Sequence, residues 1–293
     1  MKQRNELSLK KQKILDDIGL IALDLDRTTL TKKGLTDNTK ECLEEAISRG
    51  YQVVIATGRP YAALPECLWD INGLRYVICS NGAHIADLSS GEFVFSDCLS
   101  EEASSWCMEY LYNACFPIEV FTEGGAYIER ERYEKIKSSE DAMEGKEYII
   151  NTRKPVDDIW QFWRDHISRI ENINVIFNDP SDKTSVYEEL SSNKDKGFTV
   201  TSSMFYNLEI GGANTSKANA LSELSLLSGI PLKRIMSFGD SPNDSAMIIE
   251  SGFGVAMGNA EQEVKEQADY VTLSNEEEGV SFAIRTLLFK ETK

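Results

Sequence analysis

The chain has 293 residues, of which 41% are hydrophobic and 27% charged, a composition typical of proteins that fold around a buried core. Acidic residues outnumber basic ones 48 to 31, and the net charge of −17 argues against a nucleic-acid or anionic membrane surface as partner. No apolar run approaches the roughly 18 residues of a membrane span, and the N-terminus lacks a hydrophobic signal segment. We therefore expect a cytoplasmic protein of one large or two ordinary domains.

Cysteine and histidine usage narrows the chemistry further. All six cysteines fall within the first 115 residues, and none forms a Cys-x-x-Cys pair. Without a histidine cluster nearby they do not suggest a zinc site, and in a reducing compartment we expect free thiols. The two histidines, His84 and His166, lie far apart in the sequence. A serine or cysteine nucleophile that needs a histidine base therefore has little support.

An apolar run over residues 19–25 leads into two aspartates, Asp24 and Asp26. The run lacks helical spacing and predicts a buried strand of a parallel sheet. Side chains two positions apart on a strand point the same way, so we expect the two carboxylates to converge. Paired buried carboxylates need a cation or hydrogen bonds, which indicates metal binding, proton chemistry or both. By itself, the motif also fits aspartates that only form a turn at a strand end.

The next elements alternate between helix and strand. A helix capped by Thr36 and closed by Gly50 precedes a predicted strand at residues 51–56. The turn after this strand leads into a further predicted helix at Pro60, and residues 75–80 predict a third strand. This rhythm indicates a parallel, doubly wound sheet.

From about residue 85 the pattern changes. Residues 100–115 predict an amphipathic helix, and Glu123-Gly-Gly125 separates two short strands as in a hairpin. Further predicted strands and a helix around Trp160 follow. We therefore expect a separate α+β unit, whose strand order the sequence does not give.

The doubly wound pattern then resumes. A helix opens at Lys217 and ends before Gly229, and a strand at 235–238 turns through residues 239–244 into another helix. Short strands and a last helix complete the chain. The predicted fold is therefore an α/β, Rossmann-like core with a doubly wound parallel sheet, interrupted by an inserted α+β domain. The predicted boundaries are residues 1–84 plus 206–293 for the core and 85–205 for the inserted domain.

Polar residues gather in four loops at the carboxyl ends of the core strands, where ligands bind in open α/β sheets. Lys217 opens a helix and opposes its dipole, so it is a candidate for binding an anion. A salt bridge to Asp240 and a snorkelling surface lysine are the alternatives. Asp244 also fits a capping box at the start of its helix. The residues in these loops are Asp24, Asp26, Thr57, Gly58, Lys217, Asp240, Asn243 and Asp244.

These charges are consistent with a single site for a metal and a phosphate. Without a hard cation the four aspartates would repel one another, and oxygen-only ligands favour Mg²⁺. A phosphate would be held by Lys217, by the hydroxyls of Thr28 and Thr57, and by amides at helix starts. The sequence therefore predicts a magnesium-assisted phosphate site.

Four motifs in a fixed order carry a family resemblance: Asp24-Leu-Asp26-Arg-Thr28, Thr57-Gly-Arg59, Lys217 and Gly239-Asp-Ser-Pro-Asn-Asp244. The set resembles the haloacid dehalogenase-like superfamily, and within it the Cof-type phosphatases, whose cap domain is inserted between the second and third motifs. Ser80-Asn-Gly-Ala83 is similar to that subgroup as well. The resemblance covers nearly the whole core, whereas the inserted domain matches only in size and position.

The resemblance implies a role for each matching residue. Asp24 would attack phosphorus and become phosphorylated, and Asp26 would protonate the leaving alcohol and then activate water. Mg²⁺ would be held by the Asp24 carboxylate, the Asp26 backbone carbonyl and Asp240, with Asp244 acting through water. The residues that would bind the phosphoryl group are Thr57, Gly58, Lys217 and Asn243.

The chain departs from the family pattern at Arg27, where glycine is usual. An arginine there could bind a second anionic group of the substrate or could simply be exposed, since lone exposed charges usually contribute little. Arg27, Arg59 and Asn81 are the candidates for substrate contact outside the phosphoryl group.

We therefore expect a Mg²⁺-dependent phosphatase for small phosphorylated metabolites, with sugar phosphates as the expected class and a cap that selects the leaving group. A phosphomutase of the same superfamily and a catalytically weak phosphometabolite-binding protein are the alternatives. A dinucleotide oxidoreductase does not fit. The glycine-containing segment 252–258 is one residue longer than the dinucleotide-binding fingerprint, and it lies late in the sheet rather than after the first strand. The oligomeric state stays open.

Overall fold

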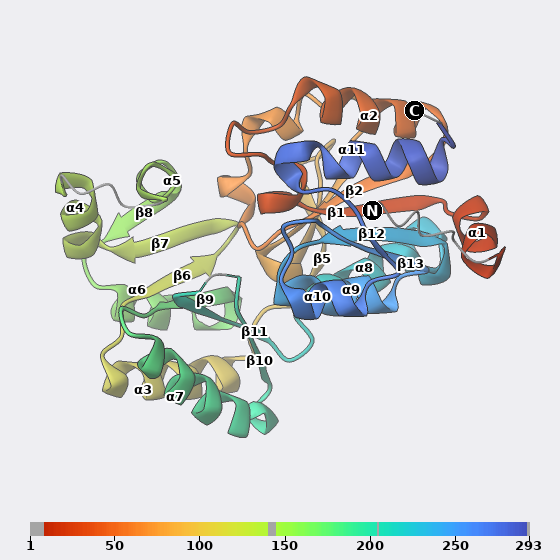
Figure 1. The fold of residues 1–293 in the computed structure, drawn as a ribbon. Coiled ribbons are helices and arrows are strands. Elements are labelled where there is room, and N and C mark those ends of the chain that lie inside the picture. The colour runs from red at the N-terminus through yellow and green to blue at the C-terminus, as the bar shows by residue number, and fades with distance from the viewer. Residues whose placement is uncertain (1–8, 140–144, 204, 292–293) are drawn as a thin grey trace.

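The computed structural model describes residues 9–139, 145–203 and 205–291. Figure 1 shows two lobes, each built on its own β-sheet. Each lobe also has its own hydrophobic core. No helix within these residues is long and apolar enough to cross a membrane. The chain is an α/β protein with a doubly wound core and an inserted cap, which confirms the predicted fold class.

The core sheet has the strand order β14-β13-β12-β1-β2-β3-β4-β5. Strands β14 to β3 run parallel, and β4 and β5 add an antiparallel hairpin at one edge. β1 lies in the middle of the sheet, between β12 and β2. The strands are β1 (Leu20–Asp24), β2 (Gln52–Ala56), β3 (Tyr76–Cys79), β4 (His84–Asp87), β5 (Glu92–Ser96), β12 (Ile235–Gly239), β13 (Phe253–Ala256) and β14 (Tyr270–Val271).

Helices cover both faces of the core sheet (Figure 1), which is why its central strands are continuous apolar runs. α2 and α11 pack on the face that carries Ile21 and Leu23, whereas α8 packs on the face that carries Leu20 and Ala22. The helices of this lobe are α1 (Leu9–Asp16), α2 (Asp37–Ser48), α8 (Lys217–Ser228), α9 (Ser245–Glu250), α10 (Gln262–Gln267) and α11 (Gly279–Ala283).

Capping signals in the sequence determine where α2 and α8 begin. The side-chain oxygens of Thr36 and Ser216 each accept a hydrogen bond from the N–H three residues later, at 3.2 and 3.0 Å. α8 ends at Gly229, whose φ of +71° is the left-handed conformation that glycine adopts easily. Lys217 is therefore fixed as the first residue of α8, as predicted.

The cap sheet has the strand order β10-β11-β9-β6-β7-β8 and is antiparallel except for the β7–β8 pair. Helices α3, α6 and α7 cover one of its faces. The strands are β6 (Ile118–Thr122), β7 (Gly125–Glu129), β8 (Arg153–Val156), β9 (Ile170–Ile176), β10 (Phe198–Thr201) and β11 (Asn207–Gly212). The helices are α3 (Glu101–Ala114), α4 (Arg130–Ser138), α5 (Lys146–Thr152), α6 (Ile159–Asp165) and α7 (Pro180–Ser192).

The two sheets divide the chain later than the predicted boundaries at both ends. β4 and β5, expected to begin the inserted domain at residue 85, belong to the core sheet. β11, expected to belong to the core from residue 206, pairs with β9 in the cap sheet. The helix–strand alternation stops after β3 although the core sheet continues. β3 and β4 are antiparallel, and antiparallel strands are joined by a tight turn without a crossover helix.

The segment after β2 also differs from the prediction. Instead of a helix from Pro60, the chain forms two single 3₁₀ turns, Tyr61–Ala63 and Glu66–Leu68. Pro65 explains the interruption, because the residue before a proline avoids helical dihedrals. Leu64 is accordingly extended, with ψ of 135°.

Candidate active site

Four chain segments meet at one edge of the core sheet. Because β1 lies between β2 and β12 and all three are parallel, their carboxyl ends bring Asp24, Thr57 and Asp240 to the same edge. Lys217 reaches this edge from the first turn of α8. The structure thus brings together the loops that the sequence placed at one site.

Lys217 is the buried cation of this site. The residue is 2% exposed, and its Nζ donates to Asp24 Oδ1 at 2.6 Å and to Asp244 Oδ1 at 2.7 Å. Burial lowers the pKa of Lys217, but the two carboxylates outweigh burial and raise that pKa above its ordinary value. Lys217 therefore stays charged, and its partners are these two residues rather than Asp240.

Asp24, Asp240 and Asp244 form a compact acidic cluster. One carboxylate oxygen from each lies within 4.8 Å of the others. Burial raises the pKa of Asp24 well above its ordinary value; Lys217 opposes the shift and the other two carboxylates add to it. Burial and the charge of Asp244 raise the pKa of Asp240 to about 6, against the opposing charges of Arg27 and Lys217. The cluster carries more negative charge than Lys217 alone balances.

The donor set of this cluster fits a hard divalent cation. Asp240 Oδ2 is buried and has no hydrogen-bond partner among the described residues, although Arg27 Nε lies 3.3 Å away. An orphaned carboxylate oxygen beside two further carboxylates is the oxygen-only environment that Mg²⁺ prefers. The residues present therefore fit the predicted metal.

Both carboxylate oxygens of Asp244 accept hydrogen bonds. Oδ1 accepts from Lys217, and Oδ2 accepts from the backbone N–H groups of Asp240 (3.0 Å) and Ser241 (3.1 Å). The contact with the Ser241 N–H is part of the capping box that the sequence suggested. Because both oxygens are engaged, Asp244 is suited to supporting a metal through water.

Asp26 lies apart from the cluster, which corrects the expectation that two positions on one strand bring it beside Asp24. β1 ends at Asp24, and Asp26 sits in the turn that follows. Its side chain is 48% exposed, and both carboxylate oxygens accept from Arg59, through Nε at 2.9 Å and Nη2 at 2.5 Å. The Arg59 guanidinium in turn lies 4.6 Å from the ring centre of Tyr148 in the cap. Arg59 thus connects Asp26 to the cap.

Arg27 occupies the turn after Asp26 with a left-handed φ of +60°. Glycine, usual at this position in the resembled family, would adopt that conformation without strain. The Arg27 side chain is 57% exposed and points its Nε to Asp240. It therefore pairs with a residue of the acidic cluster.

The residues predicted to bind phosphate surround the cluster. Thr28 Oγ1 donates to Asp240 Oδ1 at 3.4 Å, and Thr57 Oγ1 accepts from the Arg59 N–H at 3.1 Å. Asn243 Nδ2 donates to Asn81 Oδ1 at 3.1 Å. In the described part of the chain, Asn243 Oδ1 is buried without a hydrogen-bond partner.

Two cap residues at this site are absent from the predicted set. Glu209 of β11 accepts from Asn81 Nδ2 at 2.6 Å, and Glu171 of β9 accepts from Ser80 Oγ at 2.7 Å. For Glu209 the available signal was a carboxylate between Leu208 and Ile210, whereas the run around Glu171 also contains Asn172 and Asn174 and gave no comparable signal. The sequence alone does not reveal which core atoms these carboxylates meet, since that depends on how the cap docks.

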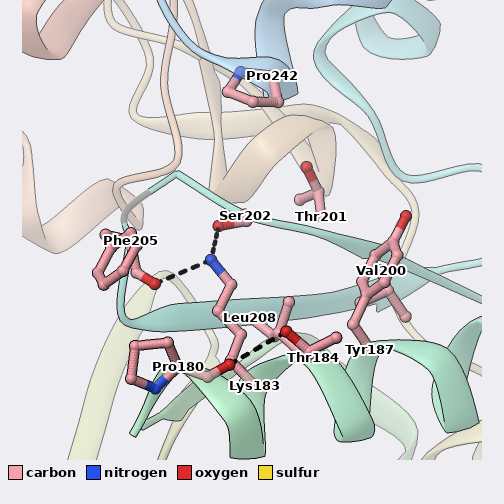
Figure 2. A pocket seen from close by; sticks show the side chains of 10 residues that line it. All are labelled: Pro180, Lys183, Thr184, Tyr187, Val200, Thr201, Ser202, Phe205, Leu208 and Pro242. Carbon is pink, nitrogen blue, oxygen red and sulfur yellow. Dashed lines mark hydrogen bonds between the residues drawn. The ribbon is translucent and has the colours of Figure 1, made fainter. Parts of the chain in front are cut away.

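A cavity of about 550 Å³ lies beside the acidic loop, between α7, β10 and Pro242. Figure 2 shows Lys183 of α7 donating to Ser202 Oγ (2.9 Å) and to the Phe205 carbonyl (3.1 Å) on one side of it. Because Pro242 belongs to the loop that carries Asp240 and Asn243, the cavity borders the site from the cap side.

Comparison with known sequences gives one consistent family. The sequence model of the haloacid dehalogenase-like hydrolases matches residues 21–284. The Bacillus subtilis 5-amino-6-(5-phospho-D-ribitylamino)uracil phosphatase YcsE is 30% identical over 277 residues, covering 92% of this chain and 95% of the relative. Phosphatase YwpJ of the same organism is 29% identical over 285 residues, covering 92% and 99%.

Solved structures agree with these relatives. A haloacid dehalogenase-like hydrolase from B. subtilis superimposes with a TM-score of 0.81 at 27% identity. The match covers 92% of this chain and 100% of that one. Both lobes are therefore included in the similarity.

Proposed function

Because the chain belongs to the haloacid dehalogenase-like hydrolases and is a phosphatase of that family, we propose that it hydrolyses small phosphorylated metabolites by way of a phosphorylated Asp24. Sugar phosphates are the proposed substrate class, and Mg²⁺ is the proposed cofactor. The observation that carries the proposal is the buried cluster of Asp24, Asp240 and Asp244 around Lys217. The whole site is proposed to lie in the core lobe, with the inserted lobe as its cap.

Four aspartates would hold the metal: Asp24 through its carboxylate, Asp26 through its backbone carbonyl, Asp240 directly and Asp244 through water. The orphaned Asp240 Oδ2 supports this assignment. When bound, Mg²⁺ would offset the repulsion between the carboxylates and an anionic phosphate.

Asp24 is the proposed nucleophile. A carboxylate oxygen of Asp24 forms a bond to phosphorus, and the bond from phosphorus to the substrate oxygen breaks. Asp26 gives its proton to the leaving alcohol. Water then attacks phosphorus, Asp26 takes a proton from it, and inorganic phosphate leaves as the Asp24 carboxylate is regenerated. The Asp26 side chain is 48% exposed, which leaves it accessible to the alcohol and to water when it is released from Arg59.

The phosphoryl group is proposed to lie against Lys217, Thr28, Thr57, Gly58 and Asn243. Lys217 offers charge, and the Asn243 Nδ2 amide, which gives one hydrogen to Asn81 Oδ1, carries a second hydrogen that can be donated to a phosphoryl oxygen. Interactions that strengthen as negative charge moves on to the transferring oxygens would lower the barrier.

A polyhydroxylated leaving group is supported by the relative YcsE, which is named for a substrate with phosphate on a ribityl chain. The cavity beside Pro242 offers additional room at the boundary between cap and core. The test is a panel of phosphorylated metabolites assayed for free phosphate with and without Mg²⁺. Release of one phosphate per substrate consumed supports a phosphatase, whereas transfer to another hydroxyl would indicate a mutase.

Mg²⁺ affinity is expected to fall as the pH drops through about 6, the pKa of Asp240. Protons compete with the metal for this carboxylate, so each pH unit below that value should weaken binding by up to about tenfold. The same pKa shift affects stability in the metal-free protein. Because the Asp240 pKa is higher in the folded than in the unfolded chain, the folded chain binds the proton more tightly, and the contribution of Asp240 to the free energy of unfolding falls as the pH rises from 3.8 to about 6. Isothermal titration calorimetry across this range measures the effect, and a constant affinity would contradict it.

Arg27→Gly is expected to tighten Mg²⁺ binding about three- to tenfold. The change removes a cation 3.3 Å from Asp240 Oδ2 and also relieves the left-handed backbone of a non-glycine residue. Arg27→Lys keeps the charge and serves as the matched control, with an affinity near that of the wild type. Unchanged or weaker binding in Arg27→Gly would show that Arg27 does not compete with the metal.

A further inference from the structure

The core loop Ser80–Gly82 has an unusual backbone. Ser80, Asn81 and Gly82 have consecutive φ values of +49°, +57° and +106°, which glycine adopts easily, asparagine less readily and other residues rarely. A Cβ on Gly82 would lie 2.2 Å from the carbonyl oxygen of Ser216, directly before Lys217. The loop therefore packs tightly on the start of α8, and two of its residues need other contacts to keep this conformation.

Asn81 touches three of the residues proposed to bind the phosphoryl group. Its N–H donates to the Thr57 carbonyl at 3.0 Å, and its Oδ1 accepts from Asn243 Nδ2 at 3.1 Å. The same Oδ1 lies 3.1 Å from the place of a Cβ on Gly58. The position of the Asn81 amide thus decides where the Asn243 amide points and how the Gly58 backbone packs.

Two carboxylates of the cap hold this core loop. Glu171 is fully buried and accepts from Ser80 Oγ at 2.7 Å, and Glu209 is 8% exposed and accepts from Asn81 Nδ2 at 2.6 Å. They come from β9 and β11, which are neighbours in the cap sheet. Each of the two strained non-glycine residues is therefore bonded by one carboxylate from the other lobe.

The remaining oxygen of each carboxylate is occupied by other groups. Glu171 Oε1 accepts from the Gly124 N–H at 2.5 Å and lies 3.1 Å from His84 Nε2. Glu209 Oε1 accepts from Ser203 Oγ at 2.6 Å and from Asn207 Nδ2 at 3.1 Å. Glu209 is thus fixed from the cap side and directed at Asn81.

We infer that Glu209, with Glu171 beside it, is a positioning residue for phosphoryl transfer, acting from the cap through Asn81 on Asn243 and Gly58. This inference rests on the proposed function of the core site. Glu209 itself does not contact the phosphoryl group. Its bond to Asn81 places the phosphate-binding amides only while the cap is docked on the core, so that binding of phosphate and docking of the cap support each other.

Glu209→Met tests the inference, because methionine fills a similar volume and removes both acceptor oxygens. We expect inhibition by inorganic phosphate to weaken about tenfold, the effect of one lost hydrogen bond to a charged group. kcat/KM for p-nitrophenyl phosphate should fall to a similar degree, while the melting temperature stays within a few degrees. Glu209→Gln keeps one acceptor for Asn81 and should restore most of both values.

Ser203→Ala is the matched control. It removes a bond to the same carboxylate from the cap side but leaves the bond to Asn81, so phosphate inhibition should stay within about twofold of the wild type. Should Glu209→Met give too little folded protein, Glu209→Asp replaces it, since it keeps the charge and shortens the reach by one methylene. The same loss in phosphate inhibition is then expected.

A double-mutant cycle distinguishes positioning through Asn81 from a general structural role. Asn81→Gly tolerates the left-handed backbone and should reproduce the loss seen in Glu209→Met. In that background Glu209→Met should add less than about twofold. Additive losses, or an unchanged phosphate inhibition in Glu209→Met, would overturn the inference. Failure of the proposed function would appear differently, as absence of phosphatase activity in the wild-type protein itself.

Discussion

Asp24→Asn is expected to lower kcat for p-nitrophenyl phosphate by at least about 1,000-fold. Asparagine matches aspartate in size but cannot form the bond to phosphorus on which turnover depends. Steady-state release of p-nitrophenolate at saturating Mg²⁺ measures the change. A purely electrostatic role for Asp24 would leave much more activity, because Asp240 and Asp244 still provide two carboxylates at the same place.

The Asp24→Asn protein should remain folded, which makes its kinetic loss interpretable. Lys217 keeps its bond of 2.7 Å to Asp244, and one of three mutually repelling carboxylates is removed. We therefore expect a free energy of unfolding within about 1 kcal/mol of the wild type. A folded variant with near wild-type kcat would contradict the role of Asp24.

Lys217→Met is expected to lower the free energy of unfolding by about 3–5 kcal/mol in the absence of metal. The substitution leaves Asp24 and Asp244 buried without their shared cation. Breaking a buried ion pair from one side is among the most destabilising single changes, because the remaining charge keeps its desolvation penalty. Urea denaturation monitored by tryptophan fluorescence measures the loss.

Mg²⁺ should restore part of the stability of Lys217→Met, since a bound cation offsets the same charges. Lys183→Met serves as the control, because it removes a lysine from α7 in the cap, outside the acidic cluster. A loss below about 1 kcal/mol in Lys217→Met would mean that the cluster is not held together by this lysine.

The core could be predicted because its signals are local. The apolar run that ends at Asp24 and the capping residues Thr36 and Ser216 each specify an element without reference to distant residues. Parallel strands then place their carboxyl ends at one edge, which brings Lys217 to Asp24. The site follows from strand order and helix starts.

The features that the sequence did not provide depend on contacts between distant segments. Asp26 turns away from the cluster because β1 ends two residues earlier and Arg59, 33 positions further along, takes both of its oxygens. The helix α7 was not among the predicted elements. It has only two buried apolar residues, Val186 and Leu190, so its sequence shows little of the apolar periodicity of an amphipathic helix, although Asp179 caps it. The contacts of Glu209 with the core exist only once the two lobes have docked.

The central claim, a covalent bond between Asp24 and phosphorus, can be examined by crystallography with a fluoride analogue of the adduct. Crystals soaked with Mg²⁺ and beryllium fluoride should show the trifluoroberyllate on an Asp24 carboxylate oxygen, within reach of Lys217 and Asn243. Density for the analogue on another residue, or its absence from an enzyme that turns over in the same crystals, would contradict the account.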